Sequence, residues 1–350
     1  MTIYHPLIVT NKFVWRVVFL LLFVTLANCP AVLAQIRVGM IGLDTSHVIS
    51  FTKIINDANA PGDLADIKIV AAYPGGSPSF PPSRDRVEGF TKQVAAMGIE
   101  IVDSIPSLLE KVDVVMLESV DGSQHLEQAK LVFESGKRVF IDKPFAASLV
   151  DATAIVELSR RHSVPFFSCS GKRYQAEYAT LLDEAKVGKV MGCDVYGTSK
   201  SVPNHPDLFW YGVHGCEVLY TVLGTGCVQV TAHQTTAYEQ VTGTWADGRI
   251  GTFRGIREAG GKTGFGITVF TEKQITSTTI GSDKKALMLE IARFFKTGKS
   301  PLDPDTTLEI FAFMQAAEAS KQLGGKPIKI ADIMKSARKA ALKKIGPQVP

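Results

Sequence analysis

The chain has 350 residues, of which 45% are hydrophobic and 21% charged, and its net charge is +4 at pH 7. This length is enough for two domains, each with a core of its own. The composition is ordinary for a soluble protein and contains no low-complexity tract, and the small net charge gives no indication of nucleic-acid binding.

We predict that residues 1–34 are a targeting signal. Lys12 and Arg16 precede an apolar run at residues 17–26, which is short for a membrane span, and small residues precede Gln35. The sequence therefore predicts an exported, periplasmic or extracellular protein with no stable membrane span after processing. An uncleaved segment that anchors the protein to the membrane is the alternative.

Cysteines are few in the part of the chain after this segment. An even number of cysteines in an exported protein permits disulfides, but their spacing pairs none of them. We favour buried free thiols for all four, which are Cys169, Cys193, Cys216 and Cys227.

The first half of the chain alternates between two kinds of apolar pattern. Short apolar runs predict strands at residues 36–41, 67–73, 99–102, 112–117, 138–141 and 164–169. Helical patterns occur at about 48–55, 124–135 and 149–162. This alternation predicts a parallel sheet with right-handed crossovers, as in a Rossmann-type domain.

The pattern changes after residue 173. Alternating segments predict strands at 189–199, 228–232, 242–245, 250–253 and 265–271, with a hairpin turn at Asp247-Gly248. Helices follow at 284–296 and 306–322, and the Lys/Arg-rich stretch 335–344 is interpreted as a solvated helix face. We therefore predict an α/β fold with a Rossmann-type domain at 35–170, an α+β domain with a large, mostly antiparallel sheet at 171–330, and a basic C-terminal helix and tail at 331–350.

Several segments occur in a fixed order from residue 36 to about 330. They are the strand and turn at 36–42, Asp142-Lys143-Pro144, Lys172-Arg173-Tyr174, the stretch 187–190, and 211–217 with His214 and Glu217. In this combination the chain resembles the glucose–fructose oxidoreductase, inositol dehydrogenase and rhizopine-catabolism family (Gfo/Idh/MocA). The resemblance implies an NAD or NADP cofactor at the carboxyl ends of the parallel strands, a sugar-like or polyol substrate, and a homo-oligomer.

The resemblance also implies the catalytic residues. Lys143 would bind and polarise the reacting oxygen, His214 would transfer the proton, and Glu217 replaces an aspartate of the family motif. A further aspartate of the family, four residues before this histidine, is replaced by Trp210. The usual proton relay is therefore incomplete.

The glycine fingerprint that normally holds a pyrophosphate is altered as well. Counting from Gly42, Asp44 replaces the second glycine and His47 replaces the third. Asp44 would put a carboxylate where the phosphates lie, and the second strand ends without the acid that usually holds the adenine ribose. Our predicted cofactor-binding residues are Gly39, Gly42, Asp44, Thr45, Ser46, Glu118 and His125. The polar loop after the second strand (Ser77, Ser79, Ser83 and Arg84) could instead meet the 2′-phosphate of NADP, although an exposed loop is the preferred interpretation.

Carboxylates and imidazoles follow the first and fourth strands, which are neighbours in a sheet of this kind. They could bind a divalent metal, but we favour helix caps and a hydrogen-bonded cleft wall and assign no metal ligand. The residues in question are Asp44, His47, Glu118, Asp121 and His125.

The leading hypothesis is an NAD(P)-dependent oxidoreductase that acts on a sugar or polyol hydroxyl. The alternatives are a non-redox sugar lyase or hydrolase and a catalytically silent carbohydrate-binding protein on the same fold. Export adds an objection to the first hypothesis, because free dinucleotide is scarce outside the cytoplasm.

Overall fold

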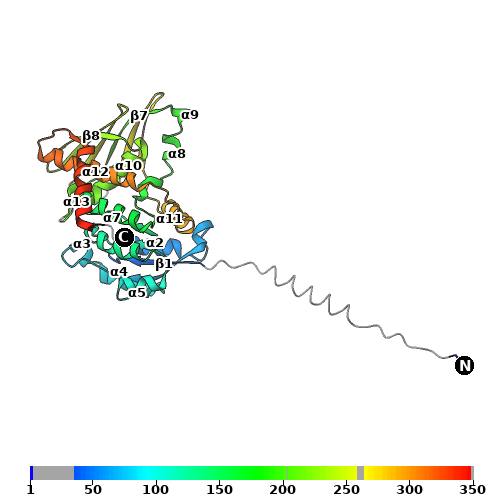
Figure 1. The fold of residues 1–350 in the computed structure, drawn as a ribbon. Helices are drawn as coiled ribbons and strands as arrows, with labels where there is room; N and C mark the ends of the chain where they lie inside the picture. Colours follow the sequence, from blue (N-terminus) through cyan, green and yellow to red (C-terminus); the bar gives the residue numbers. More distant parts are fainter. Residues whose placement is uncertain (3–34, 203, 258–263, 348–350) are drawn as a thin grey trace. The chain divides into compact units, whose positions relative to one another are not determined.

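The computed structural model describes residues 1–2, 35–202, 204–257 and 264–347. The predicted targeting segment lies almost entirely outside these residues. Residues 35–350 form one compact unit, in which the half that follows the N-terminal segment carries one sheet and the later half carries another (Figure 1). Among the described residues, no helix combines the length and apolar character that crossing a bilayer requires.

The first sheet is parallel and has the strand order β3-β2-β1-β4-β5-β6, which is the classic doubly wound order. Its strands are β1 (Ile36–Ile41), β2 (Ile67–Tyr73), β3 (Glu100–Ile101), β4 (Val114–Leu117), β5 (Val139–Ile141) and β6 (Phe166–Phe167). Strands β4 and β5 are buried throughout, as expected for a sheet covered on both faces. The prediction of a Rossmann-type sheet is confirmed.

Helices cover both faces of this sheet. One face packs against α2 (Ser46–Ile55), α4 (Val87–Ala96) and α11 (Lys285–Thr297). The other packs against α5 (Ile105–Lys111), α6 (His125–Glu134) and α7 (Leu149–His162). Short helical turns complete the half: η1 (Gly62–Asp66), α3 (Pro81–Arg84), η2 (Gly122–Gln124) and η3 (Gly171–Tyr174).

The second sheet has the order β12-β11-β7-β10-β9-β8-β13 and is antiparallel except for the pair β7 and β10. Asp247 and Gly248 form the turn between two of its strands, as predicted. The strands are β7 (Val190–Thr198), β8 (Cys227–Gln234), β9 (Tyr238–Trp245), β10 (Ile250–Ile256), β11 (Phe265–Thr271), β12 (Ile275–Ile280) and β13 (Ile328–Lys329).

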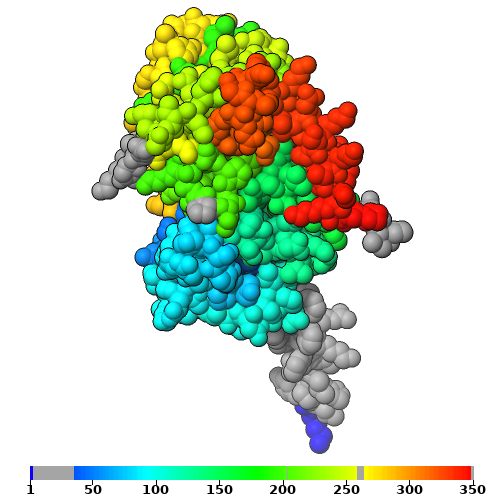
Figure 2. Space-filling view, turned by 90° about the vertical axis from the view of Figure 1, so that its left-hand side faces the viewer, coloured from blue at the N-terminus to red at the C-terminus, as the bar shows by residue number. Residues whose placement is uncertain are grey.

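One face of the second sheet packs against α10 (Val213–Leu223) and α12 (Pro304–Gln322). The short helices α8 (Tyr178–Leu181) and α9 (Glu184–Val187) lead into β7, and the π-helical turn η4 (Leu208–Gly212) leads into α10. The C-terminal helix α13 (Ile330–Ile345) packs against α7 and α12, and Figure 2 shows it in red along the surface.

The position of α11 differs from the domain division drawn from the sequence, which placed residues 171–330 together. This helix packs on the first sheet, with Leu287 and Ile291 in the same apolar cluster as β1 and α2. The ammonium group of Lys296 contacts the carboxylates of Asp63 and Asp66, both in η1, at 2.7 and 2.5 Å. The second half of the chain therefore returns to cover the first.

The predicted state of the four later cysteines is confirmed. All four are buried and free in the structure.

Candidate active site

The residues with catalytic potential gather at the carboxyl edge of the first sheet, where ligands bind in open parallel sheets. Lys143 follows β5, and His214 lies in the first turn of α10, which packs on the second sheet. Both line one pocket of about 80 Å³, together with His47. The structure thus brings Lys143 and His214 to a common pocket, although their catalytic roles stay predictions.

His214 is held in a defined orientation. Its Nδ1 lies 2.7 Å from Oγ of Ser170, in the segment after β6, and its ring packs edge-on against Tyr211 and Phe265. Burial, and then the charge of Lys143, lower the pKa of His214 well below its usual range. The imidazole is therefore neutral at neutral pH and can accept a proton.

A second histidine contributes to the same pocket. His47, in the first turn of α2, places Nδ1 2.5 Å from Oδ2 of Asp142, the residue before Lys143. Burial lowers the pKa of His47. Burial would raise the pKa of Asp142, but the charge of His47 and its hydrogen bond overcome this effect and lower the pKa of Asp142 to about 2. At neutral pH the imidazole of His47 thus donates a hydrogen bond to the ionised carboxylate of Asp142.

Glu118 lies beside this pair, after β4. It is buried, and burial followed by the charge of Asp142 raises its pKa well above the usual range.

Two further lysines make the pocket positively charged. Lys172 donates hydrogen bonds to the carbonyl oxygens of Ile280 and Gly281, and Lys284 donates to Oγ of Ser50. Burial lowers the pKa of both lysines. The ammonium groups around this pocket favour ligands that carry oxygen atoms with partial or full negative charge.

Glu217, the other predicted catalytic residue, forms a buried ion pair with Arg173. Its carboxylate accepts a hydrogen bond from Nε of Arg173, and the amide of Ser170 approaches its second oxygen at 3.4 Å. These contacts join α10 to the segment after β6, whose Ser170 contacts the ring of His214. The geometry therefore suits Glu217 to positioning, and its catalytic role remains a prediction.

The glycine turn after β1 keeps its first glycine. Gly42 has a φ of +89°, and a Cβ at this position would lie 2.4 Å from the hydroxyl of Ser119. The chain here also bonds to the segment after β2, through the amides of Gly42 and Leu43. Only glycine fits this close approach between the ends of β1 and β4.

Asp44 departs from the usual cradle. Its side chain is buried, with Oδ1 accepting from the amide of Val120 at 2.8 Å and Oδ2 accepting from the hydroxyl of Ser83 at 2.5 Å. Burial raises the pKa of Asp44 despite these hydrogen bonds. The carboxylate thus ties the segments after β2 and β4 together across the end of β1.

Two more contacts join the same segments. The hydroxyl of Ser77 donates to Oδ2 of Asp121 at 2.7 Å, and Phe80 packs with Val120 and Trp210 in a small apolar cluster. Trp210, which replaces an aspartate of the family motif, is therefore part of this closure and supplies no carboxylate to Lys143. The serines of the loop after β2 that could have met a 2′-phosphate include Ser77 and Ser83, and both are buried in these contacts.

The other predicted cofactor residues have varied surroundings. Gly39 packs against α5, where an added Cβ would meet Val112 and Leu108 at 3.0 and 3.1 Å. Thr45 caps α2 through the amide of His47, and Ser46 is exposed at the start of that helix. His125 is fully buried between the carbonyl oxygens of Ser119 and Phe145, at 2.7 and 3.1 Å.

These observations test whether the site fits a dinucleotide. The crevice above the end of β1 is filled by buried side chains, and the pocket beside Lys143 is smaller than the roughly 300–1,000 Å³ of ordinary ligand pockets. In this conformation the residues present do not fit the pyrophosphate and adenosine of NAD(P). Binding would require the segment of residues 77–86 to move away from Asp44 and Asp121.

Sequence reasoning missed several residues of this site. Asp142 could have been singled out, because it directly precedes Lys143 in the Asp-Lys-Pro motif. Lys172 could have been singled out as well, because it lies in the Lys172-Arg173-Tyr174 segment. Ser170 and Lys284 carry no comparable motif, and their place beside His214 depends on how the later segments pack.

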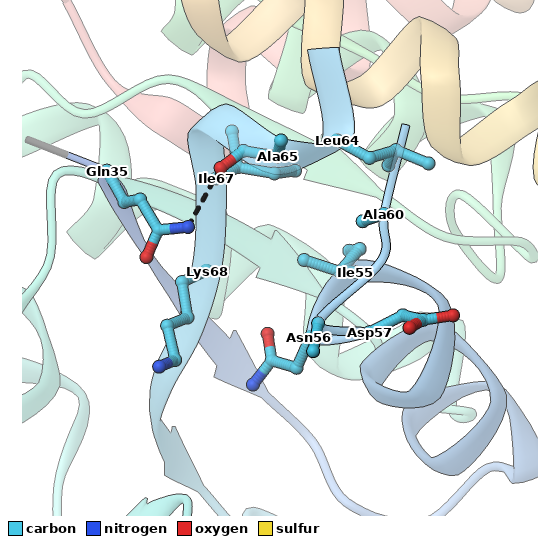
Figure 3. Close-up of a pocket in the computed structure, with 10 residues that line it drawn as sticks. Gln35, Ile55, Asn56, Asp57, Ala60, Leu64, Ala65, Ile67 and Lys68 are labelled. Carbon is cyan, nitrogen blue, oxygen red and sulfur yellow. Dashed lines mark hydrogen bonds between the residues drawn. The ribbon is translucent and has the colours of Figure 1, made fainter. Parts of the chain in front are cut away.

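A larger cavity lies at the opposite, amino edge of the first sheet. It has a volume of about 210 Å³ and is lined by residues at the starts of β1 and β2 and after α2, among them Gln35, Asn56 and Lys68. In Figure 3, Nε2 of Gln35 donates to the carbonyl oxygen of Ala65 at 2.8 Å. Its lining offers no histidine, cysteine or paired acids, so it is not the candidate active site.

The fold and the cleft define a two-domain, Rossmann-type protein with a lysine and a histidine at the carboxyl edge of its parallel sheet. Residues 36–169 match the Gfo/Idh/MocA family model, described as an oxidoreductase family with an NAD-binding Rossmann fold. The matched part of the chain contains the whole first sheet. No curated protein matches the sequence.

Solved structures share the complete two-domain architecture at low sequence identity. Scyllo-inositol dehydrogenase from Lactobacillus casei, with bound NAD(H) and scyllo-inositol, is 14% identical with a TM-score of 0.69, covering 85% of this chain and 99% of its own. An oxidoreductase from Agrobacterium radiobacter, in complex with NAD+, L-tartaric acid and magnesium, is 14% identical with a TM-score of 0.69, covering 86% and 100%. GenD2 of gentamicin A biosynthesis, in complex with NAD, is 14% identical with a TM-score of 0.68, covering 85% and 96%. At these identities the likeness establishes the fold.

Proposed function

We propose that the protein is an NAD(P)-dependent oxidoreductase that acts on a hydroxyl group of a sugar or polyol. The observation that carries this proposal is the convergence of Lys143 and His214, from different halves of the chain, on one pocket at the ligand-binding edge of the first sheet. The family of the first half and the NAD found in neighbouring structures support the cofactor.

The chain's own groups divide the work of proton transfer between them. The ammonium group of Lys143 would bind the reacting oxygen and stabilise negative charge that develops on it. His214, neutral and held by Ser170, would accept the hydroxyl proton at Nε2. The ion pair of Glu217 and Arg173 would hold α10, and with it His214, in place.

One observation favours a second candidate function. The hydrogen bonds from Ser83 and Val120 to Asp44 close the crevice in which a dinucleotide would lie. A sugar lyase or hydrolase would use Lys143 and His214 without any dinucleotide. A carbohydrate-binding protein without activity would share the same closed crevice, and turnover separates the two.

The deciding experiment is to denature the purified protein and identify any released dinucleotide by absorbance and mass. Calorimetric titration with NAD(H) and NADP(H) then covers the case in which the cofactor exchanges freely. Stoichiometric release, or measurable binding, supports the oxidoreductase. The absence of both favours the second candidate.

Turnover of a panel of sugars and polyols tests the catalytic residues. We expect Lys143→Met to reduce kcat by about 10²–10⁴-fold, the usual contribution of a positioned proton-transfer group. Lys68→Met is the matched control, because this exposed lysine lies at the opposite edge of the same sheet. Equal activity of the two variants would contradict the assignment of Lys143.

Export and self-association complete the proposal. We propose cleavage before Gln35, which N-terminal sequencing of the secreted protein would detect.

We also propose a homo-oligomer formed through the outer face of the second sheet, where Tyr196, Tyr238 and Ile250 are exposed. Light scattering with size-exclusion chromatography would measure the molecular mass in solution.

A further inference from the structure

Three side chains of metal-binding type meet at the ends of neighbouring strands. His47 lies in the first turn of α2, after β1, while Glu118 follows β4 and Asp142 follows β5. One ligand atom from each lies within 4.8 Å of the others. The sheet therefore brings an imidazole nitrogen and two carboxylates to one point, although they are distant in the sequence.

Glu118 is the member of this group that the surrounding protein does not explain. Only 1% of the residue is exposed, and among the described residues its carboxyl group interacts with a second acid, Asp142, and its oxygens have no hydrogen-bond donor from a neutral or basic group. Lys143 and Lys284 act on it through their charges, but neither ammonium group donates a hydrogen bond to it. A buried carboxylate without a donor is costly, and such groups are usually paired or coordinate a metal.

A second group of acids in the same chain is built differently. Asp207, Glu239 and Glu318 also lie close together, but the ammonium nitrogen of Lys321 stands among them at 3.1, 3.1 and 2.8 Å. That group has its cation within the chain. Within the part of the chain that the structure describes, no lysine or arginine forms an ion pair with Glu118 or Asp142.

We propose that His47, Glu118 and Asp142 bind a divalent transition-metal ion, with zinc or manganese as the candidates. Nitrogen and carboxylate oxygen ligands suit both ions, and a site with three protein ligands leaves coordination positions open. Because His47 also lines the pocket of Lys143 and His214, the site adjoins the candidate active site. An oxygen-rich ligand such as a diol or hydroxy acid would complete the coordination.

This metal site differs from the cluster considered from the sequence. Of the five residues named there, only His47 and Glu118 take part. Asp44 and Asp121 are committed to hydrogen bonds with neighbouring segments, and His125 faces two backbone carbonyls. The ammonium groups of Lys143 and Lys284 oppose a cation here, so we expect weaker binding than in a structural zinc site.

The test uses the purified protein after treatment with a chelator, which is then removed by dialysis. ZnCl2 and MnCl2 are titrated by calorimetry, and CoCl2 is titrated by visible absorption, which reports directly on nitrogen and oxygen coordination. We expect one equivalent per chain and cobalt absorption bands in the visible range. Glu118→Gln keeps the shape of the side chain and should weaken binding at least tenfold.

Glu318→Gln is the matched control, because it removes one carboxylate from the group that already holds Lys321. It should leave metal affinity unchanged. Circular dichroism and thermal melting verify that each variant folds, and Asp142→Asn replaces Glu118→Gln if the latter does not. The proposal is overturned if the wild-type protein binds less than stoichiometric metal without cobalt bands, or if a folded variant of the site binds as tightly as wild type. None of these measurements involves substrate or dinucleotide, so their outcome is separate from that of the proposed function.

Discussion

The hydroxyl of Ser83 donates to the carboxylate of Asp44 across 2.5 Å, and this bond joins the segment after β2 to the turn after β1. The same carboxylate accepts the amide of Val120 from the segment after β4. A single side chain therefore connects the ends of three adjacent strands at the place where a Rossmann domain ordinarily admits phosphate groups.

The first prediction concerns access of the cofactor. Asp44→Gly removes the carboxylate and its hydrogen bonds, so we expect NAD(P) affinity to rise at least tenfold, which corresponds to about 1.4 kcal/mol. Calorimetric titration of both proteins measures this difference. Ser83→Ala should produce a smaller increase, since Val120 still binds the carboxylate. Unchanged affinity in Asp44→Gly would show that this side chain does not control entry.

The second prediction concerns pH. The pKa of His214 is lowered in the folded protein, so the unfolded chain binds a proton at a pH where the native state does not. The stability that depends on neutral His214 is present above the unfolded pKa of about 6.5 and is lost as pH falls below it. His214→Asn cannot titrate. We expect the stability of wild type relative to this variant to decrease between about pH 7 and pH 5. Urea unfolding at several pH values measures it, and a constant difference would contradict the prediction.

The third prediction concerns the buried ion pair. Glu217→Ala leaves the guanidinium of Arg173 without its partner, and we expect a loss of about 3–5 kcal/mol in the free energy of unfolding. Adding Arg173→Met should recover part of that loss, because the uncompensated charge is removed. A double-mutant cycle from denaturant unfolding measures the coupling. Purely additive losses would indicate that the pair contributes little.

The fourth prediction concerns the packing of α10 on the second sheet. A Cβ on Gly215 would lie 2.0 Å from the ring of Phe253, which is fully buried. We expect Gly215→Ala to destabilise the protein by about 1–3 kcal/mol despite the better helix propensity of alanine. Because His214 is the adjacent residue, turnover should fall as well.

Gly89→Ala provides the comparison for this change. Gly89 lies in α4, is exposed, and has open space around its missing Cβ. The same substitution should therefore stabilise the protein, by up to about 1 kcal/mol, in thermal melts. A stabilising effect at both glycines would refute the packing argument.

Much of the fold could be predicted from local patterns. The strands β1, β2 and β11 have the bounds that their apolar runs indicate, and Asp247-Gly248 forms the expected turn. Strand β12 was missed because Thr and Ser occupy its centre, between Ile275 and Ile280 at its ends. Helices α4 and α5 were also missed. They flank the expected third strand, which has only two residues in the structure.

The site was harder to predict than the fold. The pairing of Lys143 with His214 came from a resemblance, and the packing of the two halves brings them to one pocket. The contact of His47 with Asp142 joins residues far apart in the chain. Local patterns carry no information about such contacts, which depend on strand order and side-chain orientation.

The return of α11 to the first sheet makes the two halves interdependent. Leu287, Ile291 and other buried residues of this helix, with Leu302, complete a core whose remaining buried members come before residue 170. Lys284, at the start of the helix, lines the candidate active-site pocket. An isolated fragment that ended at residue 170 would expose this apolar surface to water and lack one wall of its own ligand site. Replacing either half with that of a homologue would therefore disrupt this shared core. A chimaera would have to take α11 and the first sheet from the same parent.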